Sequence, residues 1–305
     1  MKILVTGGNG LVGTELIRQL LDHETTTQVV CVDNYYTSKP RNHTQFEKRN
    51  NFHFVQHDVC TPIESGEYDQ IYHLACPASP VHYQKDQQYT LITNITGTLN
   101  MIKLAELTGA RLLLASTSEV YGDPTVNPQP ETYWGNVNTL GPRSCYDEGK
   151  RVAETICTIS NADTVIARIF NTYGPYMALD DGRAISNFIL QALTDQPITM
   201  HGDGLQTRSF CYVQDTARGL IQLMNSHSAG PVNIGNPDEV TLLELAKQIV
   251  ELCNSNSKIV HQDAAVDDPR IRCPDIGLAQ QLGWSPTVER TQGLKYTIQY
   301  IKEML

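Results

Sequence analysis

The sequence that decides the fold is Lys2-Ile-Leu-Val-Thr6, followed at once by Gly7-Gly-Asn-Gly-Leu-Val-Gly13. The first five residues predict a short buried strand, and the apolar positions that recur through 16–21 predict a helix directly after the glycines. Glycines at 7, 10 and 13 allow a tight turn in which the backbone closely approaches a ligand. The start of a helix favours a negatively charged group there, so the stretch predicts a pyrophosphate site.

The next strand supports the same prediction. It is expected from Gln28 to Val32 and ends at Asp33, which places an acidic residue where a dinucleotide-binding unit has one. This carboxylate would accept hydrogen bonds from ribose hydroxyls and repel a 2′-phosphate, which favours NAD over NADP. Lys39 and Arg41 lie nearby and keep NADP open. A glycine-rich turn without a ligand is the simpler alternative.

Strands and helices continue to alternate along the chain. We expect strands at Phe52 to Gln56, Gln70 to Leu74, 111–115, Val165 to Arg168 and Val232 to Ile234, with a long helix from about Asp86 to Thr108. Parallel strands separated by helices form a sheet covered on both faces, with ligands at the carboxyl ends of its strands. The pattern predicts an α/β fold of the Rossmann type, with a doubly wound parallel sheet.

The character of the sequence changes after Gly174. Glycine and proline become frequent, and short helices are expected at Ala184 to Leu193, Thr241 to Cys253 and Arg290 to Leu305. We therefore predict a smaller C-terminal substrate lobe, interleaved with the sheet domain. Residues 1–174 and 210–236 would form the NAD-binding domain, and residues 175–209 and 237–305 the lobe.

Composition excludes several classes of protein. The 305 residues carry 23 Lys and Arg against 33 Asp and Glu, a net charge of −10, which argues against nucleic-acid or membrane-surface binding. No apolar run approaches the roughly 20 residues that span a bilayer. The first strand starts at Lys2, so no secretory signal is expected and we predict a cytoplasmic protein. The eight cysteines and nine histidines lack the spacing of disulfide frameworks or metal sites.

A second stretch carries the chemistry. The apolar strand from Leu112 runs into Ser116-Thr117-Ser118-Glu119, and Tyr146 and Lys150 lie four residues apart on one face of a later helix. An ammonium group and the positive nicotinamide would favour a phenolate, lowering the tyrosine pKa from about 10 by roughly 3 units. Because Tyr35 and Lys39 repeat the spacing, it is the helical setting and the preceding strand that single out Tyr146 and Lys150.

These motifs resemble the extended short-chain dehydrogenase/reductases, and more closely the UDP-glucuronate decarboxylases. The resemblance covers essentially the whole chain and rests on residues 6–13, 33, 69–75, 112–123, 141–143, 145–155, 167–172 and 186–193. Three features depart from the family: Cys76 replaces the usual Ser, Tyr176 replaces the usual Arg, and the segment between Thr155 and Val165 is short.

The resemblance implies NAD-dependent decarboxylation of UDP-glucuronate to UDP-xylose through a 4-keto sugar, with NAD regenerated internally. Thr117 would hold the C4 hydroxyl while Tyr146, assisted by Lys150, removes its proton. Glu119 and Arg272 match residues assigned to decarboxylation and protonation, and Ser118 joins the catalytic set. A surface ion pair of Arg272 with Asp267 or Asp268 is the alternative.

The same resemblance implies the ligand contacts. Asn171, Asn187, Phe188 and Arg208 would bind the UDP-sugar, and an arginine such as Arg208 suits bidentate phosphate contact unless it is structural. Asp58 could reach the adenine amino group or could be an ordinary loop carboxylate. The expected NAD contacts are Gly7, Gly10, Leu11, Val12, Gly13, Asp33, Asn34, Tyr35, Thr37, Asp58, Val59, Leu74, Ala75, Cys76, Thr93, Ala115, Tyr146, Lys150, Thr172 and Arg183.

Other functions remain open at this point. Nucleotide-sugar 4,6-dehydratases commonly carry Asp-Glu where this chain has Ser118-Glu119, since expelling a hydroxyl needs an acid. GDP-mannose dehydratases carry Ser-Glu, so they are the alternative enzymes, together with 4-epimerases. A non-catalytic NAD-binding module would not need Thr117, Glu119, Tyr146 and Lys150 together. A homodimer is expected through the helices at 86–108 and 143–160. The sequence leaves the release of UDP-4-keto-pentose undecided.

Overall fold

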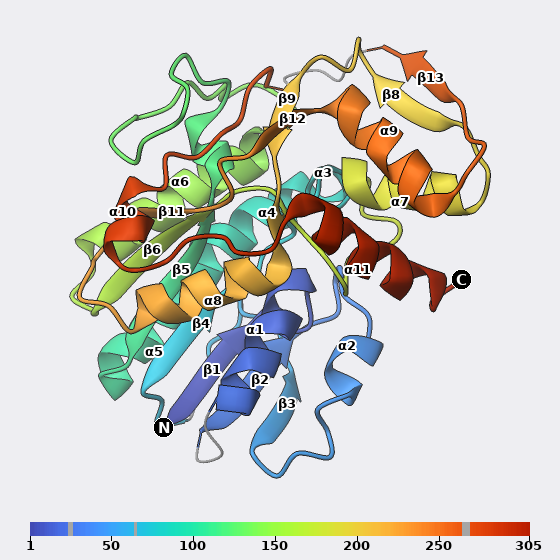
Figure 1. Ribbon diagram of the computed structural model, residues 1–305. Helices are drawn as coiled ribbons and strands as arrows, with labels where there is room; N and C mark the ends of the chain where they lie inside the picture. The colour runs from blue at the N-terminus through green and yellow to red at the C-terminus, as the bar shows by residue number, and fades with distance from the viewer. Residues whose placement is uncertain (24–26, 64–65, 264–268) are drawn as a thin grey trace.

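A seven-stranded sheet forms the centre of the computed structural model, which describes residues 1–23, 27–63, 66–263 and 269–305 (Figure 1). The strand order is β11-β6-β5-β4-β1-β2-β3, and every neighbouring pair is parallel. This confirms the predicted α/β fold. The strands are β1 (Lys2–Thr6), β2 (Gln28–Asp33), β3 (Phe52–Gln56), β4 (Gln70–His73), β5 (Arg111–Thr117), β6 (Thr164–Ile169) and β11 (Val232–Ile234).

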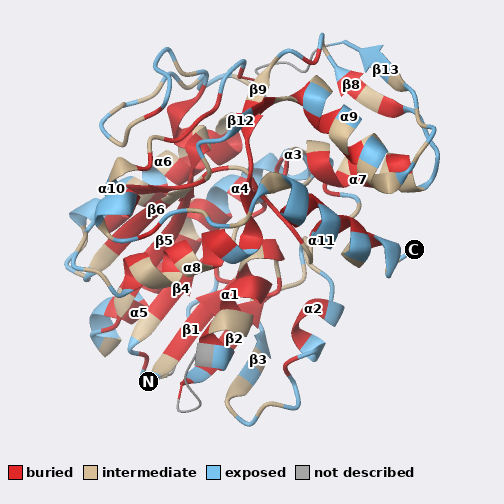
Figure 2. Ribbon diagram, in the orientation of Figure 1, coloured by how far each residue is buried: buried red, intermediate tan, exposed pale blue. Residues whose placement is uncertain are grey.

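Helices cover both faces of the sheet. Because side chains alternate across a strand, Ile3 and Val5 pack on the face of α1 (Leu11–His23) and α8 (Val213–Met224). Leu4 packs on the opposite face, against α5 (Thr98–Thr108) and α6 (Ser144–Ile159). The inner strands are accordingly buried along most of their length (Figure 2).

The helix expected from Asp86 to Thr108 is not a single α-helix. It consists of α4 (Gln87–Ile92), a π-helical turn η1 (Thr93–Gly97) and α5, and a separate helix α3 (Pro80–Lys85) precedes it. Asn94 donates to the carbonyl of Thr90 inside the turn. At Gly97 a Cβ would approach Val59 to 2.8 Å, so the chain comes close to the sheet domain there. The wider turn brings Thr93 to the ligand cavity described below.

A second apolar core lies beside the sheet. Leu11 reaches it from the first domain, and its other members come from α7 (Ala184–Leu193), α9 (Leu242–Cys253), α11 (Arg290–Lys302) and the strands nearby. The predicted domain boundaries remain a prediction. The remaining elements are α2 (Arg41–Thr44), η2 (Ser118–Tyr121), α10 (Gly277–Gln281), β7 (Thr172–Tyr173), β8 (Ile198–His201), β9 (Thr207–Ser209), β10 (Cys211–Tyr212), β12 (Glu239–Thr241) and β13 (Ile259–Gln262).

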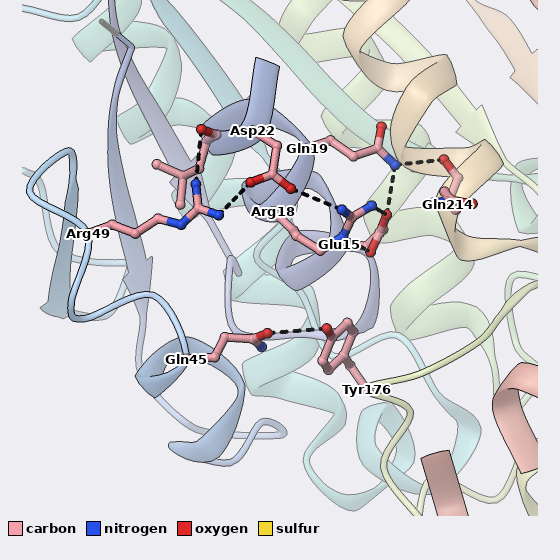
Figure 3. A network of polar contacts seen from close by, with 9 residues as sticks. Glu15, Arg18, Gln19, Asp22, Gln45, Arg49, Tyr176 and Gln214 are labelled. Carbon is pink, nitrogen blue, oxygen red and sulfur yellow. Dashed lines mark hydrogen bonds and ion pairs between the residues drawn. The ribbon is translucent and has the colours of Figure 1, made fainter. Parts of the chain in front are cut away.

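Polar contacts connect α1 and α2 with later parts of the chain (Figure 3). Gln19 of α1 donates to the carbonyl of Gln214 in α8. The hydroxyl of Tyr176 donates to Gln45 just after α2, over 3.3 Å. Tyr176, which stands where the resembling family has Arg, has a φ of +75° and packs edge-on against Tyr300 of α11. None of the helices in the described ranges is long and apolar enough to cross a membrane.

Candidate active site

A cavity of about 710 Å³ opens at the carboxyl ends of the sheet strands. Residues of the predicted NAD-binding domain and of the predicted substrate lobe both line this cavity. Its wall includes the glycine turn after β1, Arg208 of β9 and Arg272. This is the edge at which doubly wound sheets bind ligands. The predicted site residues that line it are Gly7, Gly10, Leu11, Val12, Gly13, Asp33, Asn34, Thr37, Val59, Leu74, Ala75, Cys76, Thr93, Ala115, Thr117, Ser118, Glu119, Tyr146, Lys150, Asn171, Thr172, Arg183, Asn187, Phe188, Arg208 and Arg272.

The glycine turn has the geometry that a dinucleotide requires. Gly7 has a φ of +66°, and a Cβ there would lie 2.7 Å from the backbone nitrogen of Ala75. A Cβ at Gly13 would lie 2.5 Å from the carbonyl oxygen of Gly7. The start of α1 therefore packs directly on the turn, and its N-terminus faces the cavity. These residues fit a bound NAD.

Asp33 is held in place at the end of β2. Its Oδ1 accepts from the Tyr35 backbone at 2.9 Å and from the Ser38 hydroxyl at 2.8 Å, while Oδ2 accepts from the Asn9 backbone at 3.1 Å. An ionised carboxylate has about four acceptor positions, so one is left for a ribose hydroxyl. Lys39 and Arg41 also line the cavity, and the Arg41 guanidinium lies 6.0 Å from the Tyr300 ring.

Two predicted cofactor contacts do not reach the cavity wall. The ring of Tyr35 stacks on Phe54 at 5.3 Å, and its neighbour Tyr36 lines the cavity instead. The carboxylate of Asp58 accepts from Tyr89 at 2.7 Å, and from Asn34 and the Cys60 backbone. Burial opposes ionisation of Asp58, but these hydrogen bonds outweigh it and hold the pKa of the carboxyl below its usual value. Asp58 thus supports the wall rather than forming it.

Tyr146 and Lys150 lie together in the wall of the cavity. Tyr146 is 6% exposed, and the Lys150 ammonium lies 5.9 Å from its ring while donating to the Ala115 carbonyl at 2.8 Å. The lowering expected for the phenol pKa includes the charge of a bound nicotinamide, so it stays a prediction for the complex with NAD. Burial raises the pKa of Tyr146 well above its ordinary value, because a buried phenolate loses its hydration. The positive charge of a nicotinamide would act in the opposite direction.

Glu119 lies between two arginines. One carboxylate oxygen pairs with Arg272 and the other with Arg143. Burial by itself would raise the pKa of Glu119, but the two guanidiniums hold it well below its usual value. Arg272 is 3% exposed, which contradicts a surface ion pair, and Asp267 and Asp268 lie outside the described residues. Tertiary folding thus joins residues 119 and 272, as the resemblance implied.

Among the cavity residues that the sequence reasoning missed, two contact the predicted catalytic groups directly. Arg143 stands three residues before Tyr146, and this spacing, which places both on one helix face, could have indicated it. The ring of Tyr83 stacks on Tyr146 with centroids 5.0 Å apart and planes within 4°. Its hydroxyl is buried without a hydrogen-bond partner in the described part of the chain. No spacing within the sequence connects α3 to α6, so the Tyr83 contact gave no local signal.

Other predicted groups also line the cavity. The hydroxyl of Thr117 accepts from the Glu119 backbone at 3.2 Å, and Ser118 is 2% exposed. Arg208 is buried and donates to the Thr207 carbonyl at 2.8 Å, whereas Arg183 pairs with Asp181 at 2.7 Å. Within the ranges that the structure describes, no group of His, Cys, Asp and Glu could hold a metal ion.

Together, the parallel sheet, the glycine turn and the Tyr146–Lys150 pair define a nucleotide-dependent enzyme of the short-chain dehydrogenase type. The chain belongs to the NAD dependent epimerase/dehydratase family, whose model matches residues 3–235.

Curated relatives share about half of the sequence. UDP-glucuronic acid decarboxylase 4 of Arabidopsis thaliana is 51% identical over 99% of this chain and 69% of its own length. UDP-glucuronic acid decarboxylase 3 of the same plant is 51% identical over 96% of this chain and 87% of its own length. UDP-glucuronic acid decarboxylase 1 of Danio rerio is 52% identical over all of this chain and 73% of its own length.

Solved structures share the fold. The Thermotoga maritima UDP-glucose 4-epimerase with UDP-glucose has a TM-score of 0.90 at 25% identity, covering 100% of this chain and 99% of the other. The UDP-glucuronic acid 4-epimerase of Bacillus cereus, in complex with UDP-glucuronic acid and NAD, has a TM-score of 0.89 at 28% identity and covers both chains fully.

Proposed function

We propose that this chain binds NAD and decarboxylates UDP-glucuronate to UDP-xylose. The observation that carries the proposal is the carboxylate of Glu119 between Arg143 and Arg272, in the same cavity as Thr117 and Tyr146. A sugar whose C4 hydroxyl meets Thr117 and Tyr146 presents its C5 carboxylate only one carbon further on. The half-identical relatives named as UDP-glucuronic acid decarboxylases support the same substrate.

The glycine turn, Asp33 and Lys150 would hold NAD, which would supply reversible hydride transfer at C4. Tyr146 removes the proton of the C4 hydroxyl, and Thr117 orients that hydroxyl. With a ketone at C4, the C5–carboxylate bond breaks and its electron pair moves onto the ketone oxygen as an enolate. Carbon dioxide leaves and C5 takes a proton. Reduction of the C4 ketone, with Tyr146 giving back the proton that it removed, would complete the 4-hydroxy pentose.

The charges around Glu119 define its part in the reaction. Because two guanidiniums keep this carboxylate ionised, it has no proton to give to C5 at neutral pH. Arg272, held in place by Glu119, instead orients the sugar carboxylate, and Glu119 orients the group or water that delivers the proton. Asn171, Asn187, Phe188 and Arg208 bind the UDP portion in this proposal. Ser118 stands where most 4,6-dehydratases have an acid, and a serine hydroxyl donates a proton poorly at neutral pH, although the Ser-Glu pair is shared with GDP-mannose dehydratases.

The test is a product assay with the purified protein and catalytic NAD. UDP-glucuronate should give UDP-xylose and carbon dioxide without added reductant, as followed by NMR and gas release. Formation of UDP-galacturonate, or conversion of UDP-glucose or GDP-mannose instead, would contradict the proposal and favour an epimerase or dehydratase. Tyr146→Phe should lower the rate by about 10²-fold or more. Tyr296→Phe, on the half-exposed side of α11, is the control and should not.

We also propose how the protein assembles and where in the cell it is located. We propose a homodimer through α4, α5 and α6, which pack together and expose the apolar side chains of Leu99, Leu107, Val152 and Ile159. We also propose a cytoplasmic enzyme with two lobes divided as the sequence predicts. The net charge of −10 agrees with a small-molecule substrate rather than a nucleic-acid partner.

A further inference from the structure

Asp147 is a buried carboxyl group that the proposed reaction does not use. It follows Tyr146 in the first turn of α6 and is 6% exposed, but it does not line the cavity. Its Oδ2 lies 4.0 Å from Nε of Arg143, and its buried Oδ1 has no hydrogen-bond partner among the described residues. A buried ionised carboxylate is costly unless well paired, so this arrangement suits a group that changes its protonation state.

Asp147 belongs to a cluster of four charged side chains. Glu119 of η2 pairs with Arg143 and Arg272, and Asp147 adds a second carboxyl behind Arg143. The cluster is neutral when Asp147 is ionised and carries one positive charge when Asp147 is protonated. Burial and the charge of Glu119 raise the pKa of Asp147 above its usual value, against the opposing effect of the two arginines. Further titratable neighbours are Tyr83 of α3, and Cys145, Tyr146 and Glu148 of α6.

We propose that Asp147 takes up a proton when a carboxylate-bearing sugar binds, so that recognition of the sugar carboxylate is linked to protonation of this residue. The inference deepens the proposed function and rests on it. In the pose required for oxidation at C4, the sugar carboxylate lies beside Glu119, two residues after Thr117. A third negative charge in this buried cluster disfavours an ionised Asp147, whereas a protonated Asp147 leaves the charges of the occupied site balanced.

The proposal predicts which ligands respond to pH. Affinity for UDP-glucuronate should fall as pH rises above the pKa of Asp147, by at most about tenfold per pH unit for one proton. UDP-xylose carries the same UDP group without the carboxylate, and its affinity should stay flat over that range. Asp147 therefore does not touch the sugar. It acts through Arg143 and Glu119, by changing the net charge of the cluster that the sugar carboxylate meets.

Calorimetry can count the proton directly. Tyr146→Phe enzyme loaded with NAD, in which turnover is slowed by about 10²-fold or more, is titrated with UDP-glucuronate in two buffers of different ionisation enthalpy. We expect up to one proton taken up per site with UDP-glucuronate and none with UDP-xylose. Adding Asp147→Asn should abolish the uptake, and adding Glu148→Gln, an acidic neighbour on the same helix, should preserve it. Binding of UDP-glucuronate without proton uptake, or uptake that persists in Asp147→Asn, would overturn the proposal.

A second variant and a kinetic assay distinguish loss of proton linkage from misfolding and from loss of turnover. Asp147→Ser replaces Asp147→Asn if the amide variant does not fold, as judged by circular dichroism and NAD binding. In the enzyme with Tyr146 intact, Asp147→Asn should remove the high-pH fall in kcat/KM while changing kcat much less. Conversion of UDP-glucuronate to UDP-xylose by the unmodified enzyme is assayed separately. Turnover without proton linkage rejects only this inference, whereas absence of turnover rejects the proposed function.

Discussion

The role of a single residue here depends on neighbours that are distant in sequence. Glu119 can stay ionised in a largely buried site because Arg143 and Arg272 each bind one of its oxygens. Tyr146 experiences the opposite effect, since burial raises the pKa of its phenol. Glu119 and Tyr146 line the same cavity, and their pKa values are shifted in opposite directions. Such opposite shifts are the usual basis for dividing acid and base roles.

At this scale we predict that Glu119→Gln uncouples the two halves of the reaction. Oxidation at C4 depends on Thr117 and Tyr146 and should persist, whereas carbon dioxide release should slow by about 10²-fold because Arg272, the partner of the sugar carboxylate, loses the charge that holds it in place. Stopped-flow absorbance of NADH and quenched carbon dioxide release measure the two steps. Release of carbon dioxide at an unchanged rate would contradict the role of Glu119.

A second buried ion pair offers the matched control. Glu154 and Arg168 pair at 2.7 Å with side-chain exposures of 13% and 12%, close to the 15% and 14% of Glu119 and Arg143. Glu154→Gln should therefore destabilise the fold to a similar extent. It should leave the ratio of carbon dioxide to NADH formation unchanged, which separates a loss of chemistry from a loss of stability.

Among the elements, the turn between β1 and α1 is the most constrained. Gly13→Ala should destabilise the cofactor-free protein by about 1–3 kcal/mol, because its Cβ would lie 2.5 Å from backbone Gly7 O and neither segment can easily move. Gly10→Ala is the control, since its Cβ would approach the same oxygen only to 3.4 Å. Urea unfolding of both variants without NAD measures the difference. Equal stabilities would show that the turn can relax.

The first turn of α8 fixes the segment that leads into α11. Asp215 accepts from the backbone nitrogens of Thr287 and Val288 at 2.9 and 2.8 Å, and from Arg218 at 2.6 Å. Burial opposes its ionisation, but these bonds outweigh that effect and lower the pKa of Asp215. Asp215→Asn should therefore cost about 1–3 kcal/mol at neutral pH.

The pH dependence of that loss has a definite sign. A carboxyl whose folded pKa is depressed stabilises the protein fully above its unfolded pKa of about 3.9, and this contribution disappears as pH falls through the folded value. The stability difference between the unmodified protein and Asp215→Asn, measured by urea unfolding, should shrink as pH falls below about 4. Asp123→Asn, at an exposed position, should show little difference at any pH.

At the scale of the whole molecule, exposed apolar side chains on α5 and α6 define the surface of the proposed homodimer. Leu99 is 41% exposed on α5, Val152 is 37% exposed and Ile159 is 76% exposed on α6. In the proposed homodimer these side chains are buried, so Leu99→Lys should give a species with the mass of one chain in light scattering, and the unmodified protein the mass of two. Tyr296→Lys, on α11, is the control. A monomeric unmodified protein would contradict the homodimer.

Sequence reasoning succeeded where a signal is local. The strand, the glycine turn and Asp33 lie within 33 residues, and Tyr146 and Lys150 are neighbours because of helical periodicity. It failed at the π-helical turn 93–97, where contacts of Asn94 and Gly97 with other segments change the hydrogen-bond pattern of a helical sequence. It also misplaced Tyr35, whose neighbour Tyr36 takes the cavity position because residue 35 adopts a φ of +61° and its ring packs on Phe54.

The sequence by itself determined the parallel sheet, the nucleotide turn and the residue types of the site, because strand burial, glycine geometry and helical spacing act over short stretches of chain. Only the tertiary structure decided which charges meet. Glu119, Arg143 and Arg272 come from three separate segments, and Asp147 and Tyr83 gain their significance from burial beside them. Charge coupling and desolvation depend on three-dimensional proximity, which no spacing along one chain specifies.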